Sequence, residues 1–464
     1  MPVDTSRIRY RENILGTIGG TPLVRLSRLA RGIRGLVLAK VESFNPGGSV
    51  KDRIGVSIIE EAERQGTLRP GGTIVESTSG NTGMGLALVA SVRGYRTIFT
   101  LPDKMSAEKI RLLRAFGAEV MVTPTAVPHD SPESYTEVAK RIVRETPNSI
   151  LANQYENPMN PESHYRTTGP ELWDETGGQI TWFVCGIGTG GTITGTGRYL
   201  KEKNPGIRVI GVDPKGSVLR EAFYAKRITP TLKTYKVEGI GQDYVPGVLD
   251  FRYIDDIVEA DDRQSFLMAR RLTRDEGLLT GGSSGTAVAG LMKIADRFTD
   301  DDVIVVLLPD SGERYLSKIY NDDWMRENGF LVPERITVRY LLQAKGKKPH
   351  DLIAVEPDAT VRHTLDLFKG NDVSQIPVLD GARSVGSLQD HEVMAAVLEK
   401  PSLLDSPVSA VMAPGFPTAH IDTQIADVIH LMTSKRNSAV LVEDDGAISG
   451  ILTRYDVIEF LGKE

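Results

Sequence analysis

From about residue 35 to residue 310, short β-branched runs alternate with amphipathic segments of helical length. A strand-then-helix rhythm of this kind is typical of an α/β fold, with an open, mostly parallel sheet covered by helices on both faces. One predicted helix begins at the N-cap Ser106, carries Ile110, Leu113 and Phe116 on one face, and ends at Gly117. Sheets of this class bind ligands at the carboxyl ends of their strands. The predicted strands are Leu36–Val41, Thr73–Glu76, Thr97–Leu101, Val120–Val122, Trp182–Cys185, Val209–Val212 and Val303–Leu308.

The rhythm ends near Trp324–Pro333, and an internal repeat follows. Each copy predicts helix, strand, short turn, strand and helix, and two copies about 60 residues apart indicate a pseudo-symmetric pair. The corresponding strings are Ile376-Pro-Val-Leu-Asp with Gly386-Ser-Leu-Gln-Asp-His-Glu392, and Ser438-Ala-Val-Leu-Val with Gly450-Ile-Leu-Thr-Arg-Tyr-Asp456.

A chain of 464 residues is too long for one ordinary domain. The change of pattern predicts where it divides. We expect a first domain at 1–330, a linker at 331–345, a first repeat at 346–400 and a second repeat at 401–464.

Charge and composition exclude several classes of protein. The net charge is −6 and no dense Lys/Arg run occurs, so we expect no nucleic-acid partner. The charged N-terminus (Met1–Glu12) does not look like a secretory signal, and Val303–Leu308 is too short to cross a membrane. The single cysteine, Cys185, cannot form an intramolecular disulfide, and seven scattered histidines offer no metal-site spacing. We therefore expect a cytoplasmic protein without a bound metal.

The first segment that carries chemistry is Asn45-Pro-Gly-Gly-Ser-Val-Lys51-Asp-Arg53, which follows a predicted strand and opens a helix. Pro46 and the two glycines let the chain turn sharply and approach a ligand. Lys51 lies in the first helical turn, where the helix dipole disfavours another cation, so its amine is a candidate for a Schiff base. Taken alone, the segment is equally consistent with a solvated lysine at a helix start.

Two further turns are candidate anion sites. Glu76-Ser-Thr-Ser-Gly-Asn-Thr-Gly83 brings hydroxyls, an amide and glycines to a helix start, which suits a carboxylate; an N-cap rich in small residues is the alternative. In Gly186-Ile-Gly-Thr-Gly-Gly-Thr192, the N–H groups and two threonine hydroxyls could surround a phosphate. This turn is neither the dinucleotide fingerprint nor a P-loop. Cys185, just before it, is interpreted as a small core residue.

A fourth segment, Gly281-Gly-Ser-Ser-Gly285, lies between a predicted helix over Phe266–Glu276 and another helix. One of its serines could face a ring nitrogen, although a capped helix start would explain it as well. Together the four segments supply an amine, a carboxylate site, a phosphate site and a serine, which are the parts of one cofactor site.

In this order and spacing, the segments resemble the fold-type II pyridoxal-phosphate enzymes of the cysteine-synthase superfamily, and within it the cystathionine β-synthase family. The resemblance covers nearly the whole chain, and the C-terminal repeats resemble a tandem pair of CBS domains (a Bateman module). It implies two open, mostly parallel sheet subdomains and a carbon–oxygen lyase that forms a homodimer or homotetramer. The supporting strings include Asp103-Lys-Met-Ser106, Asp130-Ser-Pro-Glu-Ser134, His164-Tyr165, Thr167-Thr168, Asp213-Pro-Lys-Gly-Ser217, Val237-Glu-Gly-Ile-Gly241 and Leu308-Pro-Asp-Ser311.

The resemblance also implies roles for individual residues. Lys51 would hold pyridoxal phosphate covalently, Asn81 would bind its ring oxygen, and Ser283 would face its pyridine nitrogen. The residues implied to bind its phosphate are Gly188, Thr189, Gly190, Gly191 and Thr192. Those implied to hold the substrate carboxylate are Thr78, Ser79, Thr82 and Gln154. Those implied to line the pocket of the second substrate are Tyr155, Gly239 and Gly241.

The implied reaction joins L-serine and L-homocysteine into cystathionine and water, with Lys51 removing the α-proton of serine. A neutral serine at the ring nitrogen makes the cofactor a weaker electron sink than a carboxylate would, which favours loss of the β-group. Gln242 stands where the family favours an aromatic residue, so the preferred thiol stays open. A cysteine synthase that uses O-acetylserine and sulfide is one alternative. An inactive sensor of adenosyl ligands is another.

Two expectations concern further ligands. Animal members of the family carry an N-terminal haem-binding extension, and this chain begins too close to the catalytic domain to contain one, so no haem is expected. In the second repeat, Thr453 and Asp456 match the pattern that holds the ribose of adenosyl ligands. The resemblance suggests S-adenosylmethionine, with Gln375 and Ile376 completing the site; a purely structural role in oligomerisation is the alternative.

Overall fold

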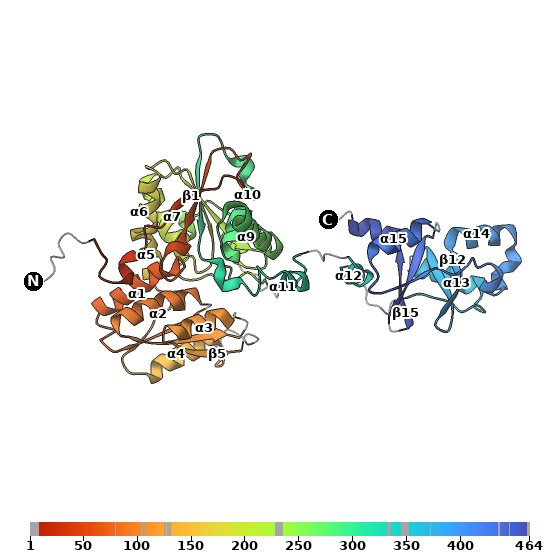
Figure 1. Ribbon diagram of the computed structural model, residues 1–464, viewed down its shortest axis with the longest axis horizontal. Coiled ribbons are helices and arrows are strands. Elements are labelled where there is room, and N and C mark those ends of the chain that lie inside the picture. The colour runs from red at the N-terminus through yellow and green to blue at the C-terminus, as the bar shows by residue number, and fades with distance from the viewer. Residues whose placement is uncertain are drawn as a thin grey trace, which may run out of the picture. The chain divides into compact units, whose positions relative to one another are not determined.

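The computed structural model describes residues 9–78, 80–103, 105, 107–124, 127, 131–227, 235–331, 336–344, 352–371, 373–434, 437–444 and 446–461. The chain divides into two compact units, an N-terminal unit (Met1–Leu331) and a C-terminal unit (Val332–Glu464), each with its own sheets and core (Figure 1).

Two sheets form the N-terminal unit. All neighbouring strands are parallel except β1, which pairs antiparallel with β2. The six-stranded sheet has the order β1(Leu23–Arg25)–β2(Leu36–Val41)–β10(Val303–Leu308)–β7(Trp182–Gly186)–β8(Arg208–Pro214)–β9(Asp256–Ala260). The four-stranded sheet has the order β5(Glu119–Thr123)–β4(Arg96–Pro102)–β3(Thr73–Ser77)–β6(Ser149–Leu151).

All seven predicted strands form, with ends that differ by at most two residues. Sequence patterns missed β1, β6 and β9. The first two have three residues each, too few for a period-two pattern, and β9 contains two acidic residues.

Helices cover both faces of each sheet. Those of the N-terminal unit are α1(Lys51–Arg64), α2(Asn81–Arg93), α3(Ala107–Ala115), α4(Tyr135–Glu145), α5(Met159–Arg166), α6(Thr168–Glu175), α7(Gly191–Lys203), α8(Leu219–Ala225), α9(Asp262–Glu276), α10(Gly282–Lys293) and α11(Asp322–Glu327). On the six-stranded sheet, α9 and α10 pack against one face and α6 and α7 against the other. On the four-stranded sheet, α1 to α3 cover one face and α4 the other. The predicted N-cap Ser106 lies outside the described residues, but the helix after it forms.

The C-terminal unit consists of the two repeats. The first has α13(Val361–Asn371), β11(Gln375–Asp380), β12(Arg383–Gln389) and α14(Asp390–Glu399). The second has β13(Thr418–His420), α15(Ile425–Ser434), β14(Ala439–Asp444), β15(Ala447–Thr453) and α16(Arg454–Leu461). Each copy thus shows the predicted helix–strand–strand–helix order, to which the second adds β13. Part of the expected linker is also helical, since α12(Val338–Ala344) buries Val338 and Leu341 in the core of the second repeat.

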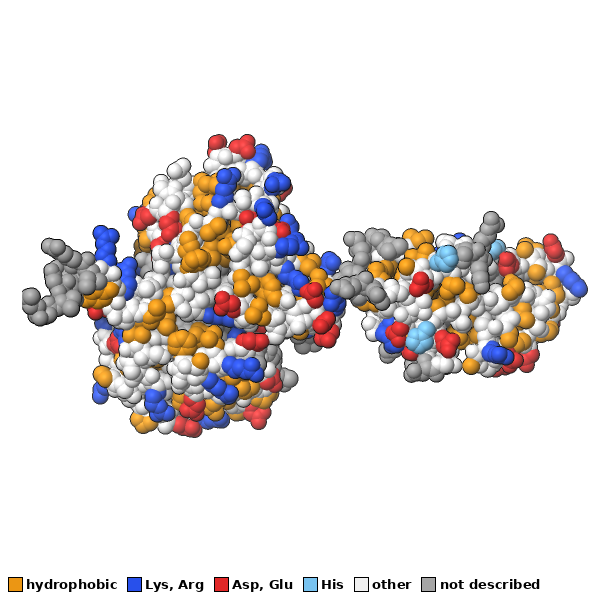
Figure 2. Space-filling view, viewed as in Figure 1, with side chains coloured by type: hydrophobic (Ala, Val, Ile, Leu, Met, Phe, Trp, Pro, Cys, Tyr) orange, Lys and Arg blue, Asp and Glu red, His pale blue; other side chains and the backbone are white. Residues whose placement is uncertain are grey.

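On the face of the N-terminal unit that Figure 2 shows, Lys and Arg side chains are interspersed with Asp and Glu side chains. Among the described residues, no helix is both long and apolar enough to cross a membrane.

Candidate active site

The predicted site residues of the N-terminal unit gather at the carboxyl ends of parallel strands. Lys51 begins α1, directly after a tight turn that follows β2. A bridge between Ser49 and Asp310, together with a bond from the Val50 N–H to the Pro309 carbonyl (2.8 Å), fastens this turn to the end of β10. The lysine is thereby fixed at the edge of the six-stranded sheet, where such folds bind ligands.

The surroundings of Lys51 favour its neutral, nucleophilic form. Burial lowers the pKa of the Lys51 amine, although the nearby Cys185 and Asp310 act in the opposite direction. Helix α2 approaches closely because it carries Gly85 here: a Cβ at this position would lie 2.5 Å from the Lys51 carbonyl oxygen. A lowered pKa makes the amine easier to deprotonate, and a neutral amine can attack an aldehyde and exchange protons. Cys185 is 2% exposed in the core beneath, which confirms its prediction as a core residue.

Asn81, the first residue of α2, has a fixed orientation. Its Nδ2 donates to Asp310 Oδ2 (2.7 Å), and its Oδ1 accepts from the Arg314 guanidinium. One N–H of the amide stays available for a ligand. The other carboxylate oxygen of Asp310 is buried without a hydrogen-bond partner among the described residues. No sequence pattern had pointed to Arg314.

Residues 188–192, which we call the glycine turn, connect β7 to α7. Gly190 has φ +90°, a backbone conformation that non-glycine residues rarely adopt. Gly188 lies against the backbone of Gly239, because a Cβ on Gly188 would come 2.6 Å from the Gly239 carbonyl oxygen. Backbone N–H groups at a helix start, in a turn whose residues 188, 190 and 191 carry no side chain, suit a phosphate. Ser283 is buried in the first turn of the neighbouring α10.

Residues 77–82, which we call the hydroxyl turn, connect β3 to α2. Thr78 Oγ1 accepts from the Gly80 N–H (3.0 Å), and Thr82 Oγ1 donates to Gln154 Oε1 (2.6 Å). Thr78, Thr82 and Gln154 are all buried, so the structure brings three of the four predicted carboxylate ligands together. Ser79, the fourth, lies outside the described residues.

The residues predicted to line the pocket for the second substrate lie on two segments of the N-terminal unit. The Gly241 N–H donates to the Ile187 carbonyl (2.7 Å), which joins residues 239–241 to the glycine turn. The Val248 N–H donates to the Tyr155 carbonyl (3.2 Å), and the rings of Tyr155 and Tyr244 lie 6.1 Å apart. Residues 239–241 are thus joined to the residue just before the glycine turn, and Tyr155 is joined to the segment that carries Tyr244 and Val248.

One ion cluster beside this pocket was not predicted. Glu238 Oε2 binds Lys109 of α3 (2.5 Å), and Glu238 Oε1 binds Lys318 (2.6 Å). Burial opposes ionisation of the carboxyl group, but the two ammonium groups lower the pKa of Glu238 below its ordinary value. The cluster ties the four-stranded side of the unit to residues 239–241. Lys109 and Glu238 are more than 100 residues apart in sequence, so no local pattern could reveal this pair.

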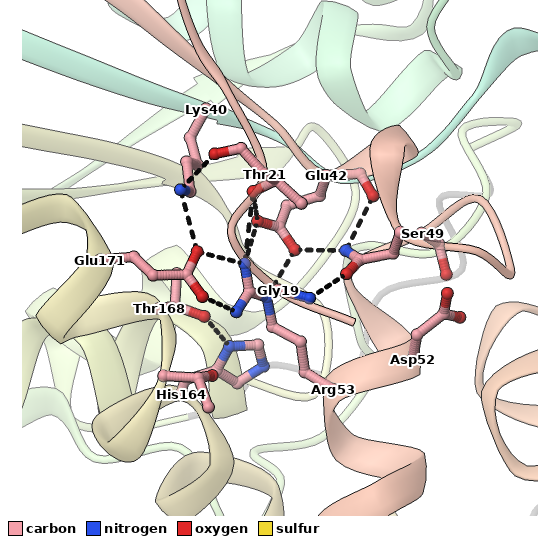
Figure 3. A network of polar contacts seen from close by, with 12 residues as sticks. Gly19, Thr21, Lys40, Glu42, Ser49, Asp52, Arg53, His164, Thr168 and Glu171 are labelled. Atoms are coloured by element: carbon pink, nitrogen blue, oxygen red, sulfur yellow. Dashed lines mark hydrogen bonds and ion pairs between the residues drawn. The ribbon is translucent and has the colours of Figure 1, made fainter. Parts of the chain in front are cut away.

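A buried polar network supports the turn before Lys51 (Figure 3). Arg53 of α1 donates to Glu42 (2.7 Å) and to Glu171 of α6 (2.6 Å). Lys40 binds Glu171 (2.9 Å), and Asn45 Nδ2 donates to Glu42 (2.8 Å). Buried charges are stable only with such partners, so removing one would leave the others uncompensated. The network fixes both ends of the segment that carries Lys51.

The described residues fit pyridoxal phosphate. They supply an amine with a lowered pKa, a glycine turn packed too closely against its neighbours to admit a Cβ at residues 188, 190 and 191, and a buried Asp310 oxygen that lacks a partner among the described residues. No group of three or more His, Cys, Asp or Glu side chains in the part of the chain that the structure describes could hold a metal ion.

The C-terminal unit brings its predicted residues into both repeats. Gln375, at the start of β11, accepts a hydrogen bond from Ser438 of the second repeat (3.1 Å), and Ile376 beside it is fully buried. At the β15–α16 junction, Asp456 Oδ2 accepts from both the N–H and the hydroxyl of Thr453 (2.7 Å each).

Known proteins resemble the chain in both units. The family model described as pyridoxal-phosphate dependent enzyme matches residues 14–310, and the CBS domain model matches residues 349–399 and 408–463. A cystathionine beta-synthase of Dictyostelium discoideum is 42% identical over 97% of this chain and 92% of that protein. Cysteine synthase A of Salmonella typhi is 45% identical over 66% of this chain and 94% of its own length. A solved hydrogen sulfide-producing enzyme from Fusobacterium nucleatum has a TM-score of 0.62 at 35% identity, covering 66% of this chain and all of that one.

Proposed function

The chain belongs to the pyridoxal-phosphate-dependent enzymes and, over nearly its whole length, to the cystathionine β-synthase family, and we propose that it condenses L-serine with L-homocysteine into L-cystathionine and water. One observation carries this proposal: relatives named cystathionine beta-synthase match through both units, whereas cysteine synthase A matches only 66% of the chain. The enzyme is accordingly a carbon–oxygen lyase that performs a β-replacement.

Each part of the cofactor has a proposed contact. Lys51 binds the aldehyde carbon covalently, and the glycine turn (Gly188, Thr189, Gly190, Gly191 and Thr192) binds the phosphate. Asn81 uses its available N–H toward the ring oxygen, in an orientation that Asp310 and Arg314 hold. Ser283 faces the pyridine nitrogen from the first turn of α10. These assignments are supported by the positions of Lys51, Asn81 and the glycine turn after strands of the same unit, and by a bridge between Thr280 and Ser311 that places the start of α10 beside the end of β10.

When bound, pyridoxal phosphate supplies the electron sink that lets the substrate lose its α-proton and its β-hydroxyl. The Lys51 amine, while not joined to the cofactor, would remove the α-proton and later deliver it to the departing hydroxyl, which leaves as water. Burial supports this role because it lowers the pKa of Lys51 and keeps the neutral base accessible.

The two amino-acid substrates have separate proposed contacts. Thr78, Ser79, Thr82 and Gln154 hold the carboxylate of serine. Tyr155, Gly239 and Gly241 line the pocket for homocysteine, whose sulfur would bond to the β-carbon in place of the hydroxyl, while the proton that the thiol gives up would return to the α-carbon through Lys51. The wall of aromatic rings at Tyr155 and Tyr244 supports a ligand with an apolar chain on this side.

For the C-terminal unit we propose an S-adenosylmethionine site formed by Gln375, Ile376, Thr453 and Asp456. The hydrogen bond from Ser438 to Gln375 supports it, because it joins the two repeats at one strand edge. We also propose a cytoplasmic homodimer or homotetramer, on the basis of the resemblance and the single, buried cysteine.

Product identification tests the activity directly. The holoenzyme is assayed with serine plus homocysteine and, separately, with O-acetylserine plus sulfide. We expect cystathionine from the first pair at the larger kcat/KM; a larger value for the second pair would make the chain a cysteine synthase. An absence of turnover with both pairs, together with a bound adenosyl ligand, would favour an inactive sensor.

A further inference from the structure

Helix α5 packs directly against the glycine turn. Its residues Asn160 and His164 are one helical turn apart and almost completely buried, with 1% and 0% of their surface exposed. A Cβ on Gly191 would overlap the Asn160 side chain, and one on Gly195 would lie 2.9 Å from His164 Cβ. The two polar side chains therefore pack directly against the end of the glycine turn and the first turns of α7.

Asn160 fixes the hydroxyl of Thr189. One N–H of its amide donates to the Gln154 carbonyl (2.7 Å), an atom that can only accept, so the orientation of the amide is unambiguous. The other N–H is left to donate to Thr189 Oγ1 (3.0 Å), which also accepts from the Gly191 N–H (3.4 Å). Because both lone pairs of Thr189 Oγ1 are occupied, its proton can only be donated elsewhere.

His164 stands in the same relation to Thr192. Its Nε2 lies 3.2 Å from Thr192 Oγ1, and its Nδ1 lies 2.9 Å from the hydroxyl of Thr168, a contact that Figure 3 shows. Burial lowers the pKa of His164 well below its ordinary value, and the charge of Arg53 lowers it further. The imidazole is therefore neutral, with one donor nitrogen and one acceptor nitrogen.

Of the two neutral tautomers, only one leaves the Thr192 proton for an anion. In it, Thr168 donates to Nδ1, the Nε2–H donates to Thr192 Oγ1, and the Thr192 hydroxyl donates into the glycine turn. In the opposite tautomer, Nε2 would accept a hydrogen bond from the Thr192 hydroxyl, and an oxygen lone pair of Thr192 would then face the anion. A chain of bonds that all run in one direction also strengthens its last donor.

We propose that Asn160 and His164 are positioning residues that hold the hydroxyls of Thr189 and Thr192 as donors toward the phosphate of the cofactor. The inference rests on the proposed placement of that phosphate on the glycine turn. It assigns the specificity for a phosphorylated cofactor partly to a helix that never touches it.

The test compares two ligands of the apo-enzyme, pyridoxal phosphate and pyridoxal, which lacks the phosphate. Dissociation constants come from absorbance and fluorescence titrations. We expect Thr192→Val to weaken the binding of pyridoxal phosphate by about 10- to 100-fold, since the substitution removes a hydrogen bond to a charged group. His164→Leu should weaken it by about tenfold, because the Thr192 hydroxyl survives but is no longer held. Affinity for pyridoxal should change less than about threefold in both variants.

Two further variants separate positioning from folding. His164→Gln keeps a neutral donor and acceptor and should restore most of the affinity for pyridoxal phosphate. Thr196→Val is a matched control: Thr196 is a buried threonine one turn further along α7, its hydroxyl has no hydrogen-bond partner among the described residues, and its loss should leave both affinities unchanged. Thermal unfolding of each apo-protein shows whether it is folded; if His164→Leu is not, the glutamine variant decides.

The possible failures are distinct. If Thr192→Val leaves the ratio of the two affinities unchanged, the phosphate does not bind the glycine turn, and the proposed cofactor site fails. If Thr192→Val lowers the ratio but His164→Leu does not, only the positioning role is overturned. Equal losses for both ligands in His164→Leu, without recovery in His164→Gln, would also overturn it.

Discussion

The glycine turn and the hydroxyl turn are both proposed to bind an anion, but they hold their hydroxyl groups differently. Both connect a parallel strand to a helix and both offer hydroxyls at a helix start. In the glycine turn, Asn160 of α5 donates to the oxygen of Thr189 and, in the proposed tautomer, His164 donates to that of Thr192, so the hydroxyl protons are left for a ligand. In the hydroxyl turn, the Thr82 proton is already donated to Gln154.

This difference corresponds to the lifetime of the two ligands. A site whose donors are held outward by a neighbouring helix binds an anion without rearranging, which suits a cofactor that stays. A site whose donors are paired with one another must break a bond to accept its ligand. Such a site exchanges its ligand readily, which suits a substrate carboxylate that enters and leaves in every cycle.

The largest expected effect comes from Lys51→Ala, because Lys51 is proposed both to bind the cofactor covalently and to act as the base toward serine. We expect turnover of serine plus homocysteine to fall by at least about a thousandfold, because the variant lacks both the covalent link and the base. If the glycine turn is the preformed anchor, pyridoxal phosphate should still bind, while pyridoxal should be lost. Borohydride trapping and peptide mapping of the unsubstituted enzyme should place the label on Lys51. A label elsewhere, or near-normal turnover of the folded variant, would refute the assignment.

The next effect tests the rigidity of the glycine turn. In Gly191→Ala the new Cβ would overlap the Asn160 side chain, so the turn or α5 must move. We expect the affinity for pyridoxal phosphate to fall by about a hundredfold, a cost typical of steric overlap in a close-packed interior. Cofactor titration of the apo-enzyme measures it. Gly370→Ala in α13 is the control, because a Cβ there meets nothing within 4 Å and should leave the affinity unchanged.

Gln154→Ala tests the hydroxyl turn, as Gly191→Ala tests the glycine turn. The variant frees the Thr82 hydroxyl but removes one proposed ligand of the substrate carboxylate, so the KM for serine should rise by about thirtyfold. The affinity for pyridoxal phosphate should stay the same, because Asn160 binds the main-chain carbonyl of residue 154, which the substitution retains. Steady-state kinetics with saturating cofactor and a parallel cofactor titration check both statements. A joint loss of both affinities would mean that the two turns are not independent.

The sequence predicted those parts of the fold and site that depend on neighbouring residues. Seven strands, the helix start at Lys51 and the repeat order in the C-terminal unit follow from local periodicity and from turn residues. The side chains that orient the site residues lie far from them in the chain: His164 is 28 residues from Thr192, and Asp310 is 229 residues from Asn81. Only the fold brings such pairs together. The spacing of Asn160 and His164 by four places them on one helical face, but no pattern indicates which turn that face supports.

The smallest expected effect lies in the C-terminal unit, where the β15–α16 junction is a third strand-to-helix turn. Asp456 is paired there with the N–H and hydroxyl of Thr453, an arrangement closer to the hydroxyl turn than to the glycine turn. A ribose that binds Asp456 must compete with Thr453, so each of its bonds contributes little net free energy. Asp456→Ala should therefore weaken the binding of S-adenosylmethionine only about five- to tenfold. Turnover in the absence of S-adenosylmethionine should change less than in Lys51→Ala, Gly191→Ala or Gln154→Ala. Asp456→Asn keeps an acceptor for the Thr453 N–H and controls for the lost helix cap. Calorimetry measures the affinity; an unchanged value would remove Asp456 from the site and would leave the exchange argument resting on the hydroxyl turn alone.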